Sequence, residues 1–114
     1  DEHYEELQAM KLQLQQFTTN ENRPFNLIEL PWPDAIYDED GERLPATYAN
    51  FLILKDSVLM PSYNQPVNDK LAIEQLAKAF PGYKITAVDC NALIKQHGSL
   101  HCVTMQLPAE ILNI

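Results

Sequence analysis

The chain has 114 residues, of which 46% are hydrophobic and 9% aromatic, and this composition predicts one folded domain with a modest core. Its formal net charge of -8 argues against nucleic acid as a partner, because phosphate binding needs a basic surface. No apolar run is long enough to cross a bilayer, so we expect no membrane partner. Two cysteines, Cys90 and Cys102, are too few for a disulfide framework and indicate a reducing, cytoplasmic location.

The first half of the chain predicts a helix, a strand and a loop. Residues 1–17 place apolar side chains at steps of three and four, which is the spacing of one face of an amphipathic helix. Residues 25–30 form a short strand candidate. Residues 34–41 are acidic, but a calcium loop aligned on them would place Ile36 at its first ligand position and Thr47 at its last. We therefore expect a solvated loop there.

The middle of the chain predicts one strand–strand–helix–strand unit over residues 50–88, which places the chain in the α/β class. Residues 50–54 and 57–60 suit a hairpin, with Pro61 closing its second strand. Asn68 is the predicted N-cap of the helix that follows, and a third strand completes the unit. The predicted apolar stripe of this helix consists of Ala72, Ile73, Leu76, Ala77 and Phe80.

A lone unit of this kind is too small to bury both faces of its sheet, so we expect it to pack against polypeptide outside this chain. The chain also opens on Asp1 without an initiator Met or a signal peptide. We therefore expect it to be a piece of a longer protein. The sequence leaves homo-oligomerisation open.

The C-terminal part of the chain contains the residues that could carry chemistry. Residues 100–107 form a strand candidate, in which side chains would alternate between two faces. Cys102 would then share a polar face with Thr104 and Gln106, as a nucleophile with hydrogen-bonding neighbours would. His101 would point away and would be a poor general base for the thiol.

Two other interpretations of these residues stay open. A strand cysteine is usually a small buried hydrophobe, and Cys102 could be one. A zinc site is the second alternative, since two sulfurs and two imidazoles are available from Cys90, His97, His101 and Cys102. We expect no metal site, because His101 and Cys102 would lie on opposite strand faces. Upstream, Gly98 would let the backbone approach a ligand closely or adopt a positive φ.

Three ordered blocks of sequence carry a family resemblance. The first reads Gly98-Ser99-Leu100-His101-Cys102-Val103-Thr104-Met105-Gln106. The second covers residues 44–51, and the third covers residues 58–61 with the helix that follows and ends at Phe80-Pro81. These blocks resemble the Porphyromonas-type peptidylarginine deiminase and agmatine deiminase family, of the guanidine-modifying (pentein) superfamily. The first block matches that family's nucleophile motif.

The resemblance implies a five-bladed, propeller-like α/β fold, of which residues 50–88 would be one unit and residues 1–114 the C-terminal part of the catalytic domain. It implies hydrolysis of agmatine or peptidyl-arginine through a covalent thiouronium intermediate, without a cofactor. For agmatine it implies a place in putrescine biosynthesis. His97-Gly98-Ser99 stands where agmatine deiminases commonly have glycines and an asparagine, which leaves the substrate open.

The resemblance also assigns residues. Cys102 would be the catalytic nucleophile, and Gly98, Ser99 and Asn50 are candidate substrate-binding residues. The family's catalytic His and its guanidinium-binding carboxylates lie mostly upstream of the matching region, so we expect the isolated chain to be inactive. The alternative from another class is a noncatalytic α/β interaction module, in which Cys102 is a structural core residue.

Overall fold

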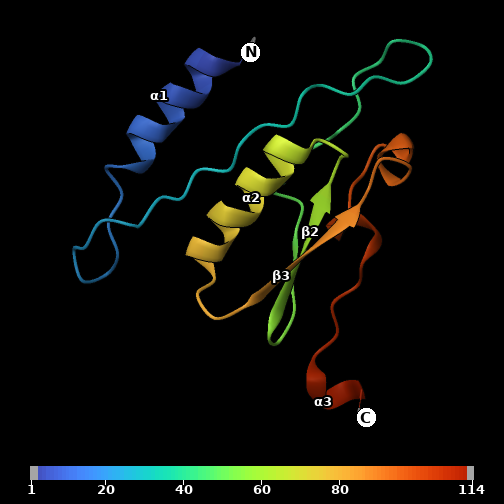
Figure 1. Cartoon of the computed structure of the whole chain (residues 1–114). Helices are drawn as coiled ribbons and strands as arrows, with labels where there is room; N and C mark the ends of the chain where they lie inside the picture. The colour runs from blue at the N-terminus through green and yellow to red at the C-terminus, as the bar shows by residue number, and fades with distance from the viewer. Residues whose placement is uncertain (1–2, 113–114) are drawn as a thin grey trace.

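The computed structural model describes residues 3–112. Among these residues it contains a three-stranded sheet, α-helices and short 3₁₀ helices (Figure 1). In chain order the elements are α1 (Tyr4–Leu14), β1 (Leu52–Ile53), β2 (Ser57–Ser62), α2 (Pro66–Ala79), β3 (Lys84–Asp89), η1 (Leu93–Gln96), η2 (His101–Val103) and α3 (Ala109–Leu112). No helix in the described part of the chain is long and apolar enough to span a membrane.

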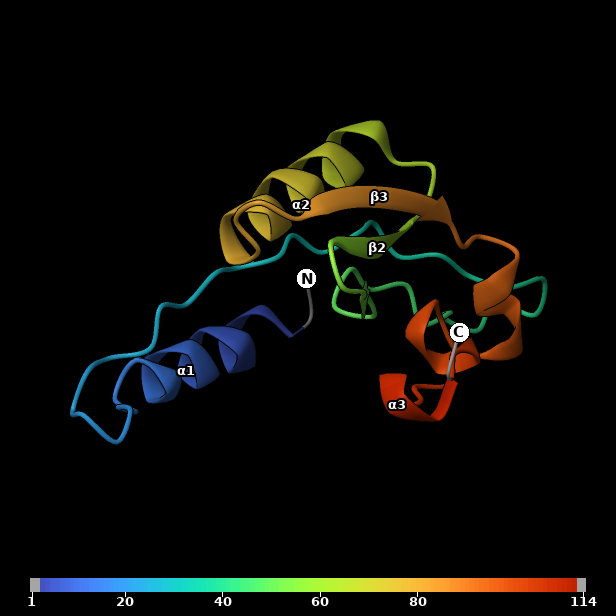
Figure 2. The same cartoon turned by 90° about the horizontal axis from the view of Figure 1, so that it is seen from below.

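The sheet has the order β1-β2-β3 and confirms the predicted strand–strand–helix–strand unit. β1 pairs antiparallel with β2, with Ile53 opposite Val58, so the predicted hairpin is present. β2 pairs parallel with β3, with Val58 opposite Ile85. Parallel neighbours need a crossover connection, and α2 supplies it and packs against β3 (Figure 2).

The prediction that Pro61 ends the second strand is wrong, because β2 continues to Ser62. Proline disrupts a strand by failing to donate to a neighbour. β1 is only two residues long and pairs with Val58 and Leu59, so at Pro61 the sheet has a neighbour on the β3 side alone. A short β1 therefore lets β2 accommodate the proline.

The predicted N-cap of the central helix is also wrong, because α2 begins at Pro66 and Gln65 occupies the cap position. Proline suits the first helical position, where its missing N–H has no helical partner. Asp69 in the first turn accepts hydrogen bonds from the backbone N–H groups of Gln65 at 3.0 Å and Tyr63 at 3.2 Å. These bonds fix the chain where β2 leads into α2.

The core lies between α2, the sheet and the segments on either side of the unit. From the predicted stripe of α2, Ala72 and Leu76 are buried and Ile73 packs against them, whereas Ala77 is exposed. β2 contributes Val58 and Met60, both fully buried. The remaining buried hydrophobic residues are Leu44, Ala46, Tyr48, Tyr63, Cys90, Ile94 and Leu100.

A buried hydrogen-bond network joins three segments at the end of β2. The Tyr63 hydroxyl accepts from the Thr47 N–H at 3.0 Å and donates to the Thr47 carbonyl at 2.9 Å. The same hydroxyl lies 2.8 Å from Ser99 Oγ. Tyr48 donates to Asp69 Oδ1 at 2.6 Å. Burial, followed by the neighbouring carboxylate of Asp69, raises the pKa of Tyr48 well above its usual value, so this phenol stays a donor.

The N-terminal segment differs from its prediction. α1 ends at Leu14, three residues short of the predicted end, and it buries no side chain. Residues 25–30 form no strand, because no neighbouring strand among the described residues meets their backbone. The carbonyl of Glu29 is instead bonded by the Gln75 amide of α2 at 2.8 Å, and its carboxylate pairs with Lys11 of α1. α1 lies apart from the sheet in both views (Figures 1 and 2).

The predicted strand over residues 100–107 is absent. Residues 101–103 form the turn η2 instead, and residues 104–108 have no regular structure. A strand exists only through pairing, and this segment pairs with none in the described part of the chain. Met105 is 85% exposed as a result. The predicted grouping of Cys102, Thr104 and Gln106 on one strand face is therefore wrong.

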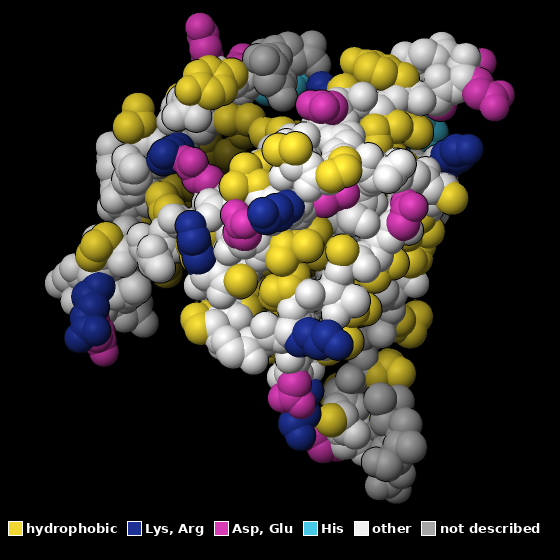
Figure 3. Space-filling view, viewed as in Figure 1, with side chains coloured by type: hydrophobic (Ala, Val, Ile, Leu, Met, Phe, Trp, Pro, Cys, Tyr) yellow, Lys and Arg dark blue, Asp and Glu magenta, His cyan; other side chains and the backbone are white. Residues whose placement is uncertain are grey.

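The molecule is more open than its length requires. Its radius of gyration is 16.2 Å, against about 13 Å for a compact chain of this length. Large apolar side chains stay exposed on several elements, among them Val67 and Leu71 of α2, and such side chains interrupt the polar surface around that helix (Figure 3). This open shape agrees with the expectation that the unit packs against further polypeptide.

Replacing Tyr63 by Phe removes the hydroxyl at the centre of the buried network and leaves Thr47 and Ser99 short of a partner. We expect the free energy of unfolding to fall by about 1–3 kcal/mol, the cost of unsatisfied buried polar groups. Urea denaturation followed by circular dichroism measures it. The matched control, Tyr83→Phe, alters a ring that is 38% exposed and should change stability by less than about 0.5 kcal/mol. Equal stability of the two variants would contradict the role of the network.

Candidate active site

Cys102 lies on η2 and is exposed, whereas Cys90 is buried. The Cys102 sulfur accepts a hydrogen bond from Asn50 Nδ2 at 3.3 Å. It is also hydrogen-bonded by the backbone of Ser99. The thiol thus has polar neighbours, as expected, but a tight turn and a segment 52 residues away provide them, and a strand does not. The alternative in which Cys102 is a core residue is contradicted by its exposure.

The hydrogen bonds to Cys102 stabilise its charged form. The backbone of Ser99, followed by the Asn50 amide, lowers the pKa of the Cys102 thiol below its ordinary value. Burial has the opposite effect on Cys90 and raises the pKa of that thiol. Cys90 donates to the Val88 carbonyl at 3.3 Å and behaves as a core residue. The structure therefore places the two thiols in environments that shift their pKa values in opposite directions.

Asn50 precedes β1 and is tied to the turn that carries Cys102. Its Oδ1 accepts the backbone N–H of His101 at 2.6 Å, and its main-chain carbonyl lies 3.3 Å from the same nitrogen. Thr104 Oγ1 closes the other end of the turn by donating to the His101 carbonyl at 2.7 Å. The turn is thereby held at both ends.

Gly98 lies against Cys102 itself. A Cβ on Gly98 would stand 3.0 Å from Cys102 Cβ and 3.4 Å from its sulfur. The close approach at this glycine in the structure is to the cysteine side chain, and the expected approach to a ligand stays a prediction. Its φ lies outside the positive range, so the second possibility given for this glycine, a left-handed backbone, is not the one that the structure adopts. His97, one residue earlier, adopts that conformation, with φ 66°.

Ser99 is 1% exposed and turns its side chain into the core. Its hydroxyl bonds to Tyr63 and to the Cys90 sulfur, so what Ser99 offers at Cys102 is its backbone. Its assignment as a substrate-binding residue stays a prediction, and its side chain points away from the exposed thiol. The contribution of Tyr63 was not foreseen, because its partner Ser99 is 36 residues away and no local spacing marks the pair.

An open depression of about 360 Å³ lies beside the cysteine turn. Its walls come from residues 49–51 and Ile53 on one side and from His101 and Gln106 on the other. His101 is exposed there, adjacent to the thiol in sequence. The depression is open to solvent and is no enclosed cavity.

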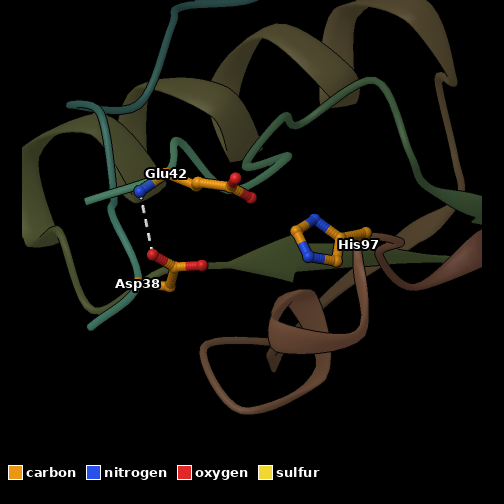
Figure 4. A group of neighbouring side chains, drawn as sticks. All are labelled: Asp38, Glu42 and His97. Carbon is orange, nitrogen blue, oxygen red and sulfur yellow. Dashed lines mark hydrogen bonds between the residues drawn. The ribbon is translucent and has the colours of Figure 1, made fainter. Parts of the chain in front are cut away.

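A second polar group lies where the acidic loop meets the end of η1. Asp38, Glu42 and His97 bring potential metal-ligand atoms within 4.8 Å of one another (Figure 4). The position of the Asp38 side chain is explained by the turn of the loop, because its Oδ1 accepts the backbone N–H groups of Glu42 at 2.8 Å and Asp40 at 2.9 Å. The residues of the zinc alternative, Cys90, His97, His101 and Cys102, form no such group among residues 3–112.

Comparison with known proteins places this geometry in a family. Residues 1–108 match the family model of the Porphyromonas-type peptidyl-arginine deiminases. A crystal structure assigned as a peptidyl-arginine deiminase is 51% identical, with a TM-score of 0.86, over 94% of this chain and 31% of that chain. A cysteine-to-serine variant of C. jejuni agmatine deiminase with substrate bound is 42% identical, with a TM-score of 0.74, over 89% of this chain and 28% of that one. A Legionella pneumophila (strain Paris) protein assigned as an agmatine deiminase is 32% identical over 95% of this chain and 31% of its own length.

The fold is that of the guanidine-modifying α/β proteins, represented by the sheet, helix and cysteine turn described above. Within that class, the chain belongs to the Porphyromonas-type peptidyl-arginine deiminase family, as the sequence resemblance implied. It spans about a third of the length of the relatives it matches.

The two thiols should differ sharply in reactivity. Alkylation needs the thiolate, so Cys102 should react with iodoacetamide in the folded protein with a pH midpoint below that of an ordinary cysteine. Cys90 should stay unmodified until denaturant unfolds the chain, because it is buried and its pKa is raised. Mass spectrometry of the two peptides across a pH series measures both. Faster labelling of Cys90 would contradict the assignment.

Introducing a Cβ at Gly98 should displace the cysteine turn. Gly98→Ala places a methyl group 3.0 Å from Cys102 Cβ, and we expect a loss of about 1–3 kcal/mol from overpacking or an equivalent shift of the turn. In either case the Cys102 alkylation rate should fall. Gly41→Asn serves as a control, since Gly41 has open space around it and asparagine tolerates its positive φ. An unchanged rate and stability in Gly98→Ala would contradict the close packing.

Proposed function

We propose that this chain is the C-terminal, nucleophile-bearing part of a cysteine-dependent guanidine deiminase and that Cys102 is the nucleophile. The observation that carries the proposal is an exposed thiol, bonded by Asn50 and the Ser99 backbone, within the family's cysteine motif. Family membership supplies the reaction class, because the relatives are agmatine and peptidyl-arginine deiminases. The lowered pKa supports the thiolate that such a reaction requires.

In the proposed reaction the Cys102 thiolate attacks the central carbon of a guanidinium group. The bond from that carbon to one nitrogen breaks, and the nitrogen leaves as ammonia after gaining a proton. Water then attacks the resulting thiouronium carbon, and the carbon–sulfur bond breaks to release a ureido product and the thiolate. The steps balance without a cofactor.

The remaining catalytic groups are assigned to polypeptide outside this chain. A general acid and base must move the protons, and carboxylates must hold the cationic substrate. The depression at the cysteine turn is lined by His101 but by no carboxylate. We propose that upstream segments of the full-length protein supply the base and the carboxylates, and that residues 50–88 form one of five similar units of a propeller-like domain.

The proposed substrate is a small guanidine of the agmatine or arginine type. Support comes from the C. jejuni relative, an agmatine deiminase with substrate bound. Agmatine would yield a carbamoylated amine and place the full-length protein in putrescine biosynthesis. The chain's net charge of -8 is compatible with a cationic substrate.

Replacing the nucleophile in the full-length protein should abolish turnover. Cys102→Ser should lower ureido-product formation from agmatine and from peptidyl-arginine by more than about a thousandfold. Cys90→Ala is the matched control, because Cys90 is a core residue outside the reaction. A colorimetric assay for ureido groups measures both variants.

The isolated chain, tested in the same assay, should show negligible turnover, because the proposed base and carboxylates are absent from it. Robust turnover by the isolated chain would refute the claim that essential groups lie elsewhere. Retained activity in Cys102→Ser would refute the assignment of the nucleophile.

A further inference from the structure

The side chain of Asn50 contacts the Cys102 turn with both of its polar atoms. Oδ1 accepts the His101 backbone N–H at 2.6 Å, and Nδ2 donates to the Cys102 sulfur at 3.3 Å. A backbone N–H can only donate, so the first bond fixes which end of the amide faces the turn backbone. The NH₂ group is consequently the end that faces the sulfur.

A donor aimed at a sulfur favours its charged form. A neutral thiol is a weak acceptor, whereas a thiolate accepts a charge-assisted hydrogen bond. The contact therefore strengthens when Cys102 loses its proton. The backbone of Ser99 is a second group that bonds to this sulfur, and Ser99 is held in place by Tyr63. The sulfur thus accepts hydrogen bonds from the Asn50 side chain and from the Ser99 main chain.

We propose that Asn50 is a positioning residue that holds the Cys102 sulfur and stabilises its thiolate, rather than a residue that binds substrate. This inference rests on the proposed function, since it matters for catalysis only if Cys102 is the nucleophile. Both amide ends of Asn50 are already occupied by the turn in this structure. The side chain of Asn50 is half-buried, and the turn fixes its orientation without a substrate.

Few titratable groups share the surroundings of the sulfur. On its own loop these are His97 and His101. On the segment that carries Asn50 the titratable side chain is Tyr48, and its hydroxyl is bonded to Asp69. β1 and residues 104–108 contribute none. Hydrogen bonds are consequently the main influence on the thiol that a substitution at Asn50 would change.

The test is the pH dependence of Cys102 alkylation in Asn50→Asp. Aspartate has the same shape and keeps an oxygen for the His101 N–H, but it replaces the donor with a negative charge beside the sulfur. We expect the pH midpoint of iodoacetamide alkylation to rise by about one unit and the rate at neutral pH to fall roughly tenfold. The control Asn26→Asp adds the same charge on an exposed loop beside α1 and α2 and should leave the profile unchanged.

Two further measurements keep the inference falsifiable. Cys90 must stay unlabelled in Asn50→Asp, which shows that the variant is folded. In the unmodified chain, the side-chain amide resonances of Asn50 should shift with the same midpoint as Cys102 alkylation in an NMR pH titration. The proposal would be overturned if the pH profile of Cys102 alkylation in Asn50→Asp coincided with that of the wild type. It would also be overturned if the Asn50 amide resonances did not change during the titration.

These measurements use no substrate, so they stand apart from the test of the proposed function. A shifted midpoint together with full activity of Cys102→Ser would refute the nucleophile and leave the Asn50 contact established. An unshifted midpoint together with inactive Cys102→Ser would refute the role of Asn50 alone. In the full-length enzyme, a role for Asn50 through Cys102 further predicts a loss in kcat with little change in KM for Asn50→Asp.

Discussion

The buried contact between the Tyr63 and Ser99 hydroxyls is the constraint on which the candidate site depends. Tyr63 follows β2, and its hydroxyl also makes two hydrogen bonds with Thr47, just before the segment that carries Asn50. One side chain therefore anchors both segments that meet at the sulfur of Cys102. Because Tyr63 is 2% exposed, water cannot readily replace these bonds, and the positions of Asn50 and the cysteine turn are linked to the packing of the sheet.

The two cysteines show how environment separates residues of one type. Cys90 follows β3 directly and is fully buried, so its thiol is kept neutral. Cys102 lies twelve positions later on an exposed turn and accepts hydrogen bonds from Asn50 and from the Ser99 backbone. Ser99 contacts both, with its hydroxyl on the Cys90 side and its backbone on the Cys102 side. A single residue thus divides the core from the surface at which chemistry is proposed.

The open parts of the molecule have a common physical cause. Residues 25–30 and 100–107 carry strand-like sequences but lack a neighbouring strand within residues 3–112, and α1 has apolar side chains but buries none of them. Strands and amphipathic helices are stable only when a partner meets their backbone or their apolar face. The chain spans about a third of the length of the relatives it matches.

The sequence by itself determined the strand–strand–helix–strand unit with its hairpin and its central helix. It also determined the family, and it distinguished Cys102 from Cys90 as the candidate nucleophile. These follow from spacing and from a motif, because hairpins and helices are built from neighbours in sequence. Only the tertiary structure decided that residues 100–107 are no strand, that Ser99 faces the core, and that Asn50 reaches Cys102. Such contacts join residues up to 52 positions apart, and they depend on how the sheet, the loop and the turn pack together, which no periodicity encodes.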